Sequence, residues 1–324
     1  MVRFLSDDDV AAVLDLESLL PVLEEAFVKQ GRGEVERPER PHYPIGRGLV
    51  GDDPLGTALT MPAYVHGATY FATKLASVHE GNAERGLPTV NATIALADAE
   101  TGLPAAYMAG TRVTNARTGC IGGLAAAHLA ASEPVTLGVV GAGTQARWQT
   151  RAIAAATDVE RVSVYSPSDS REACAAALRE EGLEATAVDS PEAALAGSSV
   201  VVTATTSIDP VFDGDALEPG TLVVAVGAYT PSMRELDART IERAARVFAD
   251  VPEEAVTVGD LAAVGFEVED LHPLSAVFEG EVGRATADEI LVVDSVGSAV
   301  LDAAAAEQLL DRASEADVGT TIPL

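Results

Sequence analysis

Gly141, Gly143 and Ala146 follow a short apolar run, with the spacing of a turn that binds the phosphates of a dinucleotide. Residues 135–140 are rich in β-branched side chains, as in a strand covered on both faces. Gly141 permits a tight turn, Gly143 lets the backbone approach a pyrophosphate, and Ala146 allows close packing of helix on strand. A helix starting near Thr144 would direct its free N–H groups at the phosphates. The spacing also occurs in structural turns, but the strand–turn–helix context predicts a dinucleotide site.

The next predicted strand bears on the choice between NAD and NADP. It is followed by Ser166, whereas an NAD site usually has an acid there for the ribose 2′-hydroxyl. Ser166, Ser168, Ser170 and Arg171 suit a 2′-phosphate instead. Asp169 is the counter-argument, although we expect it to cap the following helix. The sequence therefore favours NADP, with NAD as the alternative; a solvated helix start without a cofactor role is the structural alternative.

Two patterns of elements follow one another along the chain. From residue 135 onward strands alternate with helices or loops, which predicts a parallel, doubly wound sheet. Its strands are expected at 135–140, 161–165, 184–188, 200–205, 222–226, 246–249 and 289–293. The earlier part predicts helices over 7–14 and 16–31, then strands at 57–63, 69–79, 90–98 and 104–108. Because no helices separate these strands, we expect a second, antiparallel or mixed sheet, with 37–56 as a long ordered loop or edge strands.

Two further helices join these regions. One, over 113–130, leads into the glycine turn, and the last, over 297–312, follows the parallel sheet and is expected to return to the first domain. The predicted fold class is therefore α/β, a Rossmann-type sheet with a smaller α+β domain.

The chain is strongly acidic, with 50 Asp and Glu against 21 Lys and Arg and a net charge of −29. Such a surface repels nucleic acid and anionic membranes, so we expect neither as a partner. The only lysines are Lys29 and Lys74, which fits a salt-rich cytoplasm or an acidic protein from a GC-rich genome. Cys120 and Cys174 form no CxxC motif. With no recognisable signal peptide or membrane span, we expect a cytoplasmic enzyme without a metal site.

Six segments together resemble the ornithine cyclodeaminase/μ-crystallin family over about residues 5–305. They are 73–82, 98–104, 116–119, 141–146, 203–207 and 294–297. The resemblance implies a homodimer in which residues 1–115 with 298–324 bind substrate and dimerise. It also implies that residues 116–297 form the NAD(P)-binding Rossmann domain.

The resemblance assigns a substrate α-carboxylate to three basic residues, Arg40, Lys74 and Arg117. Guanidinium groups and an ammonium suit a carboxylate, and a lysine in an apolar strand is costly to bury without a partner. Lys74 or a water would also supply a proton. The alternatives are a structural acid beside Lys74, a surface role for Arg40 and a structural salt bridge for Arg117.

The remaining site residues follow from the same resemblance and from the ends of the predicted strands. Thr205 resembles a contact to the nicotinamide side, and Asn82 and Thr89 could line the substrate pocket. His79 is a candidate acid–base group or a structural loop histidine. The expected cofactor residues are Gly141, Gly143, Thr144, Gln145, Ala146, Ser166, Ser168, Arg171, Thr203, Thr205, Val226 and Gly227.

Two departures decide between members of the family. Cyclodeaminases carry an acid where this chain has Leu59, and they and the alanine dehydrogenase member carry an aspartate at the position of Tyr229. Ammonia elimination needs a carboxylate, and an unperturbed phenol with a pKa of about 10 is a poor base. We therefore predict an NAD(P)H-dependent reductase of a small imino acid such as Δ1-pyrroline-2-carboxylate. The alternatives are an ornithine cyclodeaminase, an alanine dehydrogenase and an NAD(P)H-binding protein without turnover.

Overall fold

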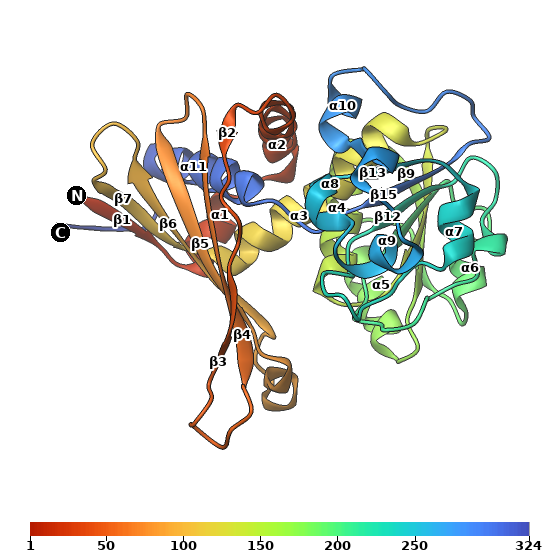
Figure 1. The fold of residues 1–324 in the computed structure, drawn as a ribbon, viewed down its shortest axis with the longest axis horizontal. Helices are drawn as coiled ribbons and strands as arrows, with labels where there is room; N and C mark the ends of the chain where they lie inside the picture. Colours follow the sequence, from red (N-terminus) through yellow and green to blue (C-terminus); the bar gives the residue numbers. More distant parts are fainter. Residues whose placement is uncertain (324) are drawn as a thin grey trace. The chain divides into compact units, whose positions relative to one another are not determined.

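The structure is a computed structural model that describes residues 1–323. The chain divides into two compact units, each with an eight-stranded sheet (Figure 1). Unit 1 comprises residues 1–117 and 299–324, and unit 2 comprises residues 118–298. These joints lie one or two residues beyond the boundaries expected from the sequence.

The sheet of unit 1 is mixed. Its strands are β1 (Val2–Leu5), β2 (Val35–Glu36), β3 (His42–Ile45), β4 (Gly56–Val65), β5 (Tyr70–Val78), β6 (Val90–Asp98), β7 (Pro104–Ala109) and β16 (Thr320–Ile322). The order is β16-β1-β7-β6-β5-β4-β2, with β3 also on β4, and the β1–β7 pair alone among these is parallel. The sequence analysis predicted β4 to β7 closely, but it did not predict the short strand β1 or the edge strand β16.

Helices from both ends of the chain cover this sheet. They are α1 (Asp7–Val13), α2 (Leu16–Gly31) and α11 (Ala299–Glu315), with the 3₁₀ turn η1 (Glu80–Arg85) after β5. Ser6 caps α1 through a capping box with Asp9. The C-terminal helix α11, blue in Figure 1, packs on α2 and on β4, β5 and β6. The last helix therefore belongs to the first unit, as expected.

Alternation along β5 gives its two faces different roles. Ala72, Lys74 and Ala76 are buried on the face that α11 covers, whereas Phe71 and Leu75 point to the other face and are 40% and 52% exposed. Lys74 therefore lies inside the unit, and Phe71 and Leu75 form part of an uncovered apolar face.

Unit 2 is a parallel sheet of order β10-β9-β8-β11-β12-β15-β13-β14. These strands are β8 (Val135–Val140), β9 (Val159–Tyr165), β10 (Ala185–Ala187), β11 (Val200–Thr203), β12 (Leu222–Ala225), β13 (Ala244–Ala249), β14 (His272–Pro273) and β15 (Ile290–Asp294). The apolar strands β8, β11, β12 and β15 are almost wholly buried at the centre of the sheet. The predicted fold class is confirmed.

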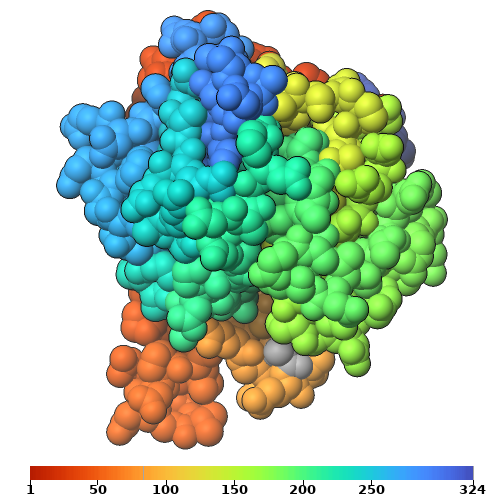
Figure 2. All heavy atoms as spheres, turned by 90° about the vertical axis from the view of Figure 1, so that its right-hand side faces the viewer, coloured from red at the N-terminus to blue at the C-terminus, as the bar shows by residue number. Residues whose placement is uncertain are grey.

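The helices of unit 2 lie between its strands in the chain. They are α4 (Thr144–Ala156), α5 (Ser170–Glu180), α6 (Pro191–Leu195), α7 (Ala238–Arg243), α8 (Pro252–Ala255), α9 (Gly259–Val264) and α10 (Leu274–Phe278), with 3₁₀ turns η2 (Gly214–Ala216) and η3 (Val268–Asp270). α3 (Gly110–Leu129) begins in unit 1 and ends in unit 2. Figure 2 shows one face of unit 2, where the green and cyan parts of the chain form a continuous surface.

Two local expectations were wrong. β11 ends at Thr203, so Thr205 lies in the loop after the strand, where a buried carboxylate binds its backbone. Asp169 occupies the N-cap position of α5, but its backbone is helical and its side chain makes no capping hydrogen bond. A capping residue needs extended backbone dihedral angles to direct its oxygen at the first N–H groups, and Asp169 lacks them.

Candidate functional site

The glycine turn of unit 2 has the geometry that a dinucleotide requires. Gly141 has φ +118°, and a Cβ there would lie 2.4 Å from the carbonyl oxygen of Ala204. Its N–H donates to the carbonyl of Tyr165 over 2.8 Å, which joins the ends of β8 and β9. Only glycine tolerates both the dihedral angle and this close approach.

The N-terminus of α4 opens beside this turn. Gly143 is the N-cap, no side chain caps the helix, and a Cβ at Gly143 would meet nothing within 4 Å. Thr144 is exposed and Gln145 half-buried in the first turn, whereas Ala146 is fully buried against the sheet. The uncapped N–H groups of a 13-residue helix beside open space fit a pyrophosphate.

The residues expected at the adenosine ribose lie at the end of β9. The hydroxyls of Ser166, Ser168 and Ser170 form a connected cluster with oxygen–oxygen distances of 2.7–3.5 Å. Arg171 donates to the carbonyl of Ser166 and forms an ion pair of 3.1 Å with the exposed Asp189. Hydroxyls and a guanidinium thus meet with no acid at the strand end itself, although Asp189 partly offsets the charge of Arg171.

Glu235, which the sequence analysis did not identify, connects the residues expected near the nicotinamide. Its carboxylate accepts hydrogen bonds from Thr203 Oγ1 over 2.9 Å, Thr205 N over 2.6 Å and Gly227 N over 2.7 Å. Val226, next to this loop, donates its N–H to the carbonyl of Thr203 over 3.1 Å. Burial raises the pKa of Glu235 to about 6, against the opposing effect of these donors. One buried acid therefore holds the loops that follow β11 and β12.

Further buried acids surround Glu235. Asp260 Oδ1 accepts from the N–H groups of Glu235 and Leu236 over 2.7 and 2.9 Å. Burial raises the pKa of Asp294 well above its ordinary value, and the charges of Asp260, Asp250 and Glu235 raise it further. The carboxyl ends of the central strands thus carry several carboxyl groups close together, and their mutual repulsion adds to the effect of burial on Asp294.

In unit 1 two of the three expected carboxylate-binding residues share one acid. Lys74 Nζ lies 2.5 Å from Asp302 Oδ2, and Arg117 Nε donates to Asp302 Oδ1 over 2.9 Å. The three residues come from β5, α3 and the first turn of α11, and each is at most 5% exposed. The alternatives considered from the sequence, a structural acid beside Lys74 and a salt bridge at Arg117, both describe real contacts.

This buried group has unusual electrostatics. Burial lowers the pKa of Lys74 to about 8 against the opposing charge of Asp302, and the charges of Arg117 and Arg40 lower it further. Burial alone would raise the pKa of Asp302, but the charges and hydrogen bonds of Arg117 and Lys74 hold it below its ordinary value. At neutral pH the group therefore contains an ionised lysine and an ionised aspartate.

The basic groups outnumber the acid. Arg40 is half-buried and near enough for its charge to lower the pKa of Lys74, and Lys74 and Arg117 share the single carboxylate of Asp302. Arg117 Nη1 is buried and has no hydrogen-bond partner among residues 1–323. An unpaired guanidinium nitrogen, and two basic groups on one carboxylate in a protein of net charge −29, suit a bound carboxylate.

The other expected residues take structural positions. Asn82 donates to the carbonyl of Pro88 over 2.9 Å, and Thr89 is exposed and accepts from the N–H of His79. His79 Nδ1 lies 3.1 Å from the carbonyl of Leu55, which supports its structural interpretation. Leu59 lies on the Lys74 face of the sheet, two residues from Met61, which pairs with Lys74.

Tyr229 is 45% exposed in the loop after β12. Neither position 59 nor position 229 therefore brings a carboxylate to its unit.

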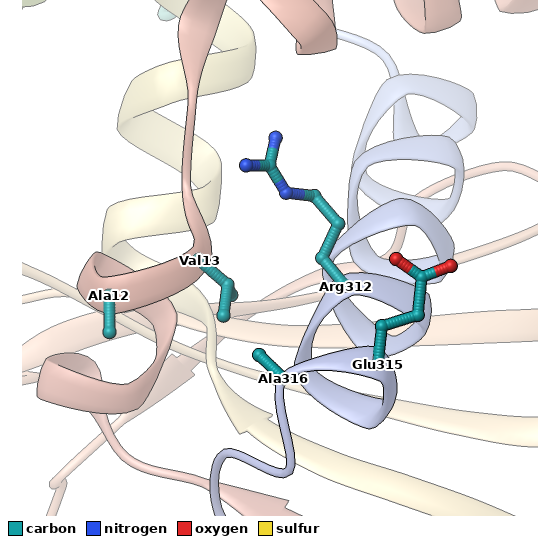
Figure 3. A pocket seen from close by; sticks show the side chains of 5 residues that line it. All are labelled: Ala12, Val13, Arg312, Glu315 and Ala316. Carbon is teal, nitrogen blue, oxygen red and sulfur yellow. The ribbon is translucent and has the colours of Figure 1, made fainter.

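Two surface hollows of unit 1 contain none of the expected site residues. One of about 340 Å³ lies between α1 and α11 and is lined by Ala12, Val13, Arg312, Glu315 and Ala316 (Figure 3). Within residues 1–323, no cluster of three or more His, Cys, Asp or Glu side chains could hold a metal ion. Nor is any helix in this part of the chain long and apolar enough to cross a membrane.

Comparison with known proteins decides the family. The profile of the ornithine cyclodeaminase/mu-crystallin family matches residues 2–317. The chain belongs to this family. Among its relatives, an alanine dehydrogenase of Archaeoglobus fulgidus is 33% identical over 98% of this chain and 97% of that protein. A Δ1-pyrroline-2-carboxylate reductase of Bacillus cereus is 33% identical over 88% of this chain and 90% of that protein.

Solved structures of the ornithine cyclodeaminase/mu-crystallin family have the same fold. The Δ1-pyrroline-2-carboxylate reductase of Thermococcus litoralis, in complex with NADH and L-proline, superposes with a TM-score of 0.92 and 29% identity, covering 99% of this chain and all of that one. An archaeal alanine dehydrogenase dimer with bound NAD gives a TM-score of 0.91 and 31% identity, covering all of this chain and 99% of that one. The resemblance stated from the sequence is confirmed.

Proposed function

We propose that the protein is an NAD(P)H-dependent reductase of a small imino acid, with Δ1-pyrroline-2-carboxylate as the model substrate. The observation that carries this proposal is the buried cationic group of unit 1, in which Lys74 and Arg117 share the single carboxylate of Asp302 and Arg117 Nη1 lacks a partner. A site of this charge binds a compound with an α-carboxylate. Relatives that act as Δ1-pyrroline-2-carboxylate reductases support the choice of substrate.

Imine reduction asks for a proton at nitrogen and a hydride at carbon. A bound nicotinamide would supply the hydride. Lys74 Nζ gives a proton to the imine nitrogen and keeps the electron pair of the broken N–H bond. Its pKa of about 8 suits this role, because a general acid works best when its pKa lies near the working pH. Arg117 and Arg40 hold the carboxylate, and Lys74 regains its proton from water. The net reaction consumes one reduced cofactor and one proton for each amino acid formed.

NADP is the cofactor that the end of β9 favours. The connected hydroxyls of Ser166, Ser168 and Ser170 beside Arg171 offer several donors to a 2′-phosphate. Gly141, Gly143, Thr144, Gln145 and Ala146 would hold the pyrophosphate. Thr203, Thr205, Val226 and Gly227 would line the nicotinamide end, with Glu235 fixing their backbone.

Two other activities of the family need a carboxylate that this site lacks. Leu59 lies on the Lys74 face of β4, where the cyclodeaminases carry an acid, and Tyr229 replaces the aspartate expected in both cyclodeaminases and the alanine dehydrogenase member. Asp302 does not substitute for them, because both its oxygens are occupied by Lys74 and Arg117. Alanine dehydrogenase remains the second candidate, since such a relative matches 98% of this chain.

An exposed apolar face of unit 1 supports a homodimer. Phe71 and Leu75 expose apolar side chains on the sheet face opposite α11, beside the half-buried Tyr64 and Pro62. A second copy on this face would bury them.

The reductase proposal is tested by mixing purified protein with NADPH and Δ1-pyrroline-2-carboxylate in concentrated potassium chloride, which screens the negative surface. We expect NADPH oxidation and L-proline. Parallel reactions contain ornithine with NAD, assayed for ammonia, and pyruvate with ammonia and NADH. Ammonia and proline from ornithine without net NADH would overturn the proposal in favour of the lyase. Turnover of pyruvate alone would favour the alanine dehydrogenase.

A further inference from the structure

We propose that Asp302 is a positioning residue that sets the proton affinity of Lys74 and fixes Arg117, so that a single buried aspartate on the C-terminal helix controls both binding and proton transfer. This inference rests on the proposed reductase function. It concerns a residue on α11, which is far in sequence from Lys74 and Arg117.

The geometry gives Asp302 two separate contacts. Its Oδ2 atom pairs with Lys74 Nζ at 2.5 Å, and its Oδ1 atom accepts from Arg117 Nε at 2.9 Å. Because the aspartate takes the Nε side of the guanidinium, Nη1 stays without a partner in the buried site. Asp302 thus orients Arg117 with one nitrogen left for substrate.

Asp302 lies in the first turn of the 17-residue helix α11. A negative charge is favoured at that end of a helix, because the helix dipole and the free N–H groups are positive there. The fold therefore supports an ionised carboxylate at 1% exposure, although burial of a lone charge is costly.

The charges that act on Lys74 come from three elements. Asp302 on α11 favours its protonated form, whereas Arg117 on α3 and Arg40 between β2 and β3 disfavour it. The strand neighbours that pair with Lys74, Met61 and Ile94, are uncharged. Without Asp302, Lys74 would lose the carboxylate that favours its protonated form and keep the opposing charges of Arg117 and Arg40, so it would lose its proton at a lower pH.

An alternative is that the three residues form a purely structural ion-pair cluster. A structural cluster would satisfy its members, as buried polar groups usually are satisfied. Here the acid is outnumbered by the bases and one guanidinium nitrogen stays unpaired, so the cluster is incomplete without a further anion. If the role of Asp302 is only structural, its replacement should lower stability without lowering the pKa of Lys74.

The chain allows a direct measurement, because Lys74 and Lys29 are its only lysines. Protein labelled with ¹³C at lysine Cε gives two signals, and the Lys29→Arg variant assigns them. We expect the Lys74 signal to titrate near its pKa of about 8 in the wild-type protein. In Asp302→Asn its pKa should fall by about one unit or more, and the alkaline limb of kcat/KM should move by the same amount.

The matched control is Asp311→Asn, on the same helix but with an exposed side chain. It should leave the Lys74 signal and kcat/KM unchanged. An unchanged Lys74 pKa in folded Asp302→Asn overturns the proposal. If Asp302→Asn does not fold, the same titration is measured on Asp302→Glu and on the wild type. The Lys74 pKa in Asp302→Glu should equal the wild-type value. A wild-type Lys74 signal that titrates at the same pH as the Lys29 signal overturns the inference.

Failure of the proposed function is a separate outcome. If the wild-type protein reduces no imino acid, the reductase proposal falls. The NMR titration would still show whether Asp302 controls the protonation of Lys74. If the wild-type protein turns over and Asp302→Asn loses roughly tenfold or more in kcat/KM at pH 8 with no pKa change, Asp302 acts only through stability or packing, and the inference is wrong.

Discussion

Asp302 contacts Arg117 only on the Nε side of its guanidinium: Oδ1 accepts a hydrogen bond from Nε over 2.9 Å, and the buried Nη1 has no partner within residues 1–323. This relationship distinguishes Arg117 from a guanidinium used up by an ordinary bidentate pair. It leaves a fixed donor at the place where Lys74 is also held. The substrate carboxylate is the group that would complete this arrangement.

Replacing Arg117 by lysine should weaken substrate binding more than turnover. Lysine keeps the charge, but it cannot contact Asp302 and a carboxylate through two fixed edges. We expect KM for Δ1-pyrroline-2-carboxylate to rise about tenfold to a hundredfold, with a smaller change in kcat. Steady-state kinetics measure this, with the surface variant Arg112→Lys as control. A KM equal to the wild type would remove Arg117 from the substrate site.

Replacing Lys74 by arginine should separate charge from proton transfer. Arginine holds its proton across the accessible pH range, so it keeps a positive charge but makes a poor proton donor. We expect kcat to fall by roughly 10²-fold or more. In the wild-type enzyme kcat/KM should decline as the pH rises through the Lys74 pKa of about 8, because the donor loses its proton. The variant should lack this limb, and an unaltered pH profile would mean that another group or water gives the proton.

Replacing Glu235 by glutamine tests the carboxylate that joins the loops after β11 and β12. Three donors point at its two oxygens, so a glutamine amide would direct its NH₂ at one of them. We expect a loss of stability of about 1–3 kcal/mol and a weaker NADPH complex. Thermal melts and fluorescence titration measure both effects, and Glu160→Gln on the exposed side of β9 is the control. Unchanged NADPH affinity would show that these loops do not position the cofactor.

Glu235 also has a defined effect on stability against pH. Its folded pKa is about 6, above the ordinary value of 4.5, so the folded state binds the proton more tightly. The resulting stabilisation is present below about pH 4.5 and is lost as the pH rises through 6. Between pH 4.5 and 7 the wild type should therefore lose about 2 kcal/mol of unfolding free energy relative to Glu235→Gln. Denaturant melts at both pH values measure it.

The sequence predicted the elements whose signals are local. The run expected at 135–140 forms β8, and the helix expected over 16–31 forms α2, both with the predicted bounds. The helix at the end of the chain was expected in the first domain, and α11 lies there. These features depend on hydrophobic periodicity, turn glycines and caps, which neighbouring residues determine.

The sequence did not identify Asp302 and Glu235, because their roles depend on residues far away in the chain. Asp302 meets Lys74 and Arg117 only when α11 packs on the sheet, and Glu235 lies in a loop without a periodic pattern. A lone acid in an otherwise apolar first helical turn was the available signal for Asp302. Asp169 shows the reverse error, since a plausible capping residue failed to cap.

Arg171→Ala tests the proposed preference for NADP. Removal of the guanidinium should weaken binding of a 2′-phosphate and leave a 2′-hydroxyl little affected. We expect kcat/KM for NADPH to fall about tenfold or more relative to that for NADH. Kinetics with both cofactors measure the ratio, and Arg239→Ala is the control on an exposed helix of unit 2. An unchanged ratio, or a wild-type enzyme that already prefers NADH, would contradict the assignment of Ser166, Ser168 and Arg171 to a phosphate.

Charged substitutions at Phe71 and Leu75 test the proposed homodimer. Both side chains are exposed on the face of β5 that α11 does not cover, and a glutamate there would be unfavourable in an apolar interface. We expect the Phe71→Glu/Leu75→Glu double variant to be monomeric in concentrated potassium chloride where the wild type is dimeric. Sedimentation velocity measures the mass, and Ile208→Glu, at a 66% exposed residue of unit 2, is the control. A double variant that remains dimeric would move the interface away from this face, because two buried carboxylates per protomer would be costly next to apolar side chains.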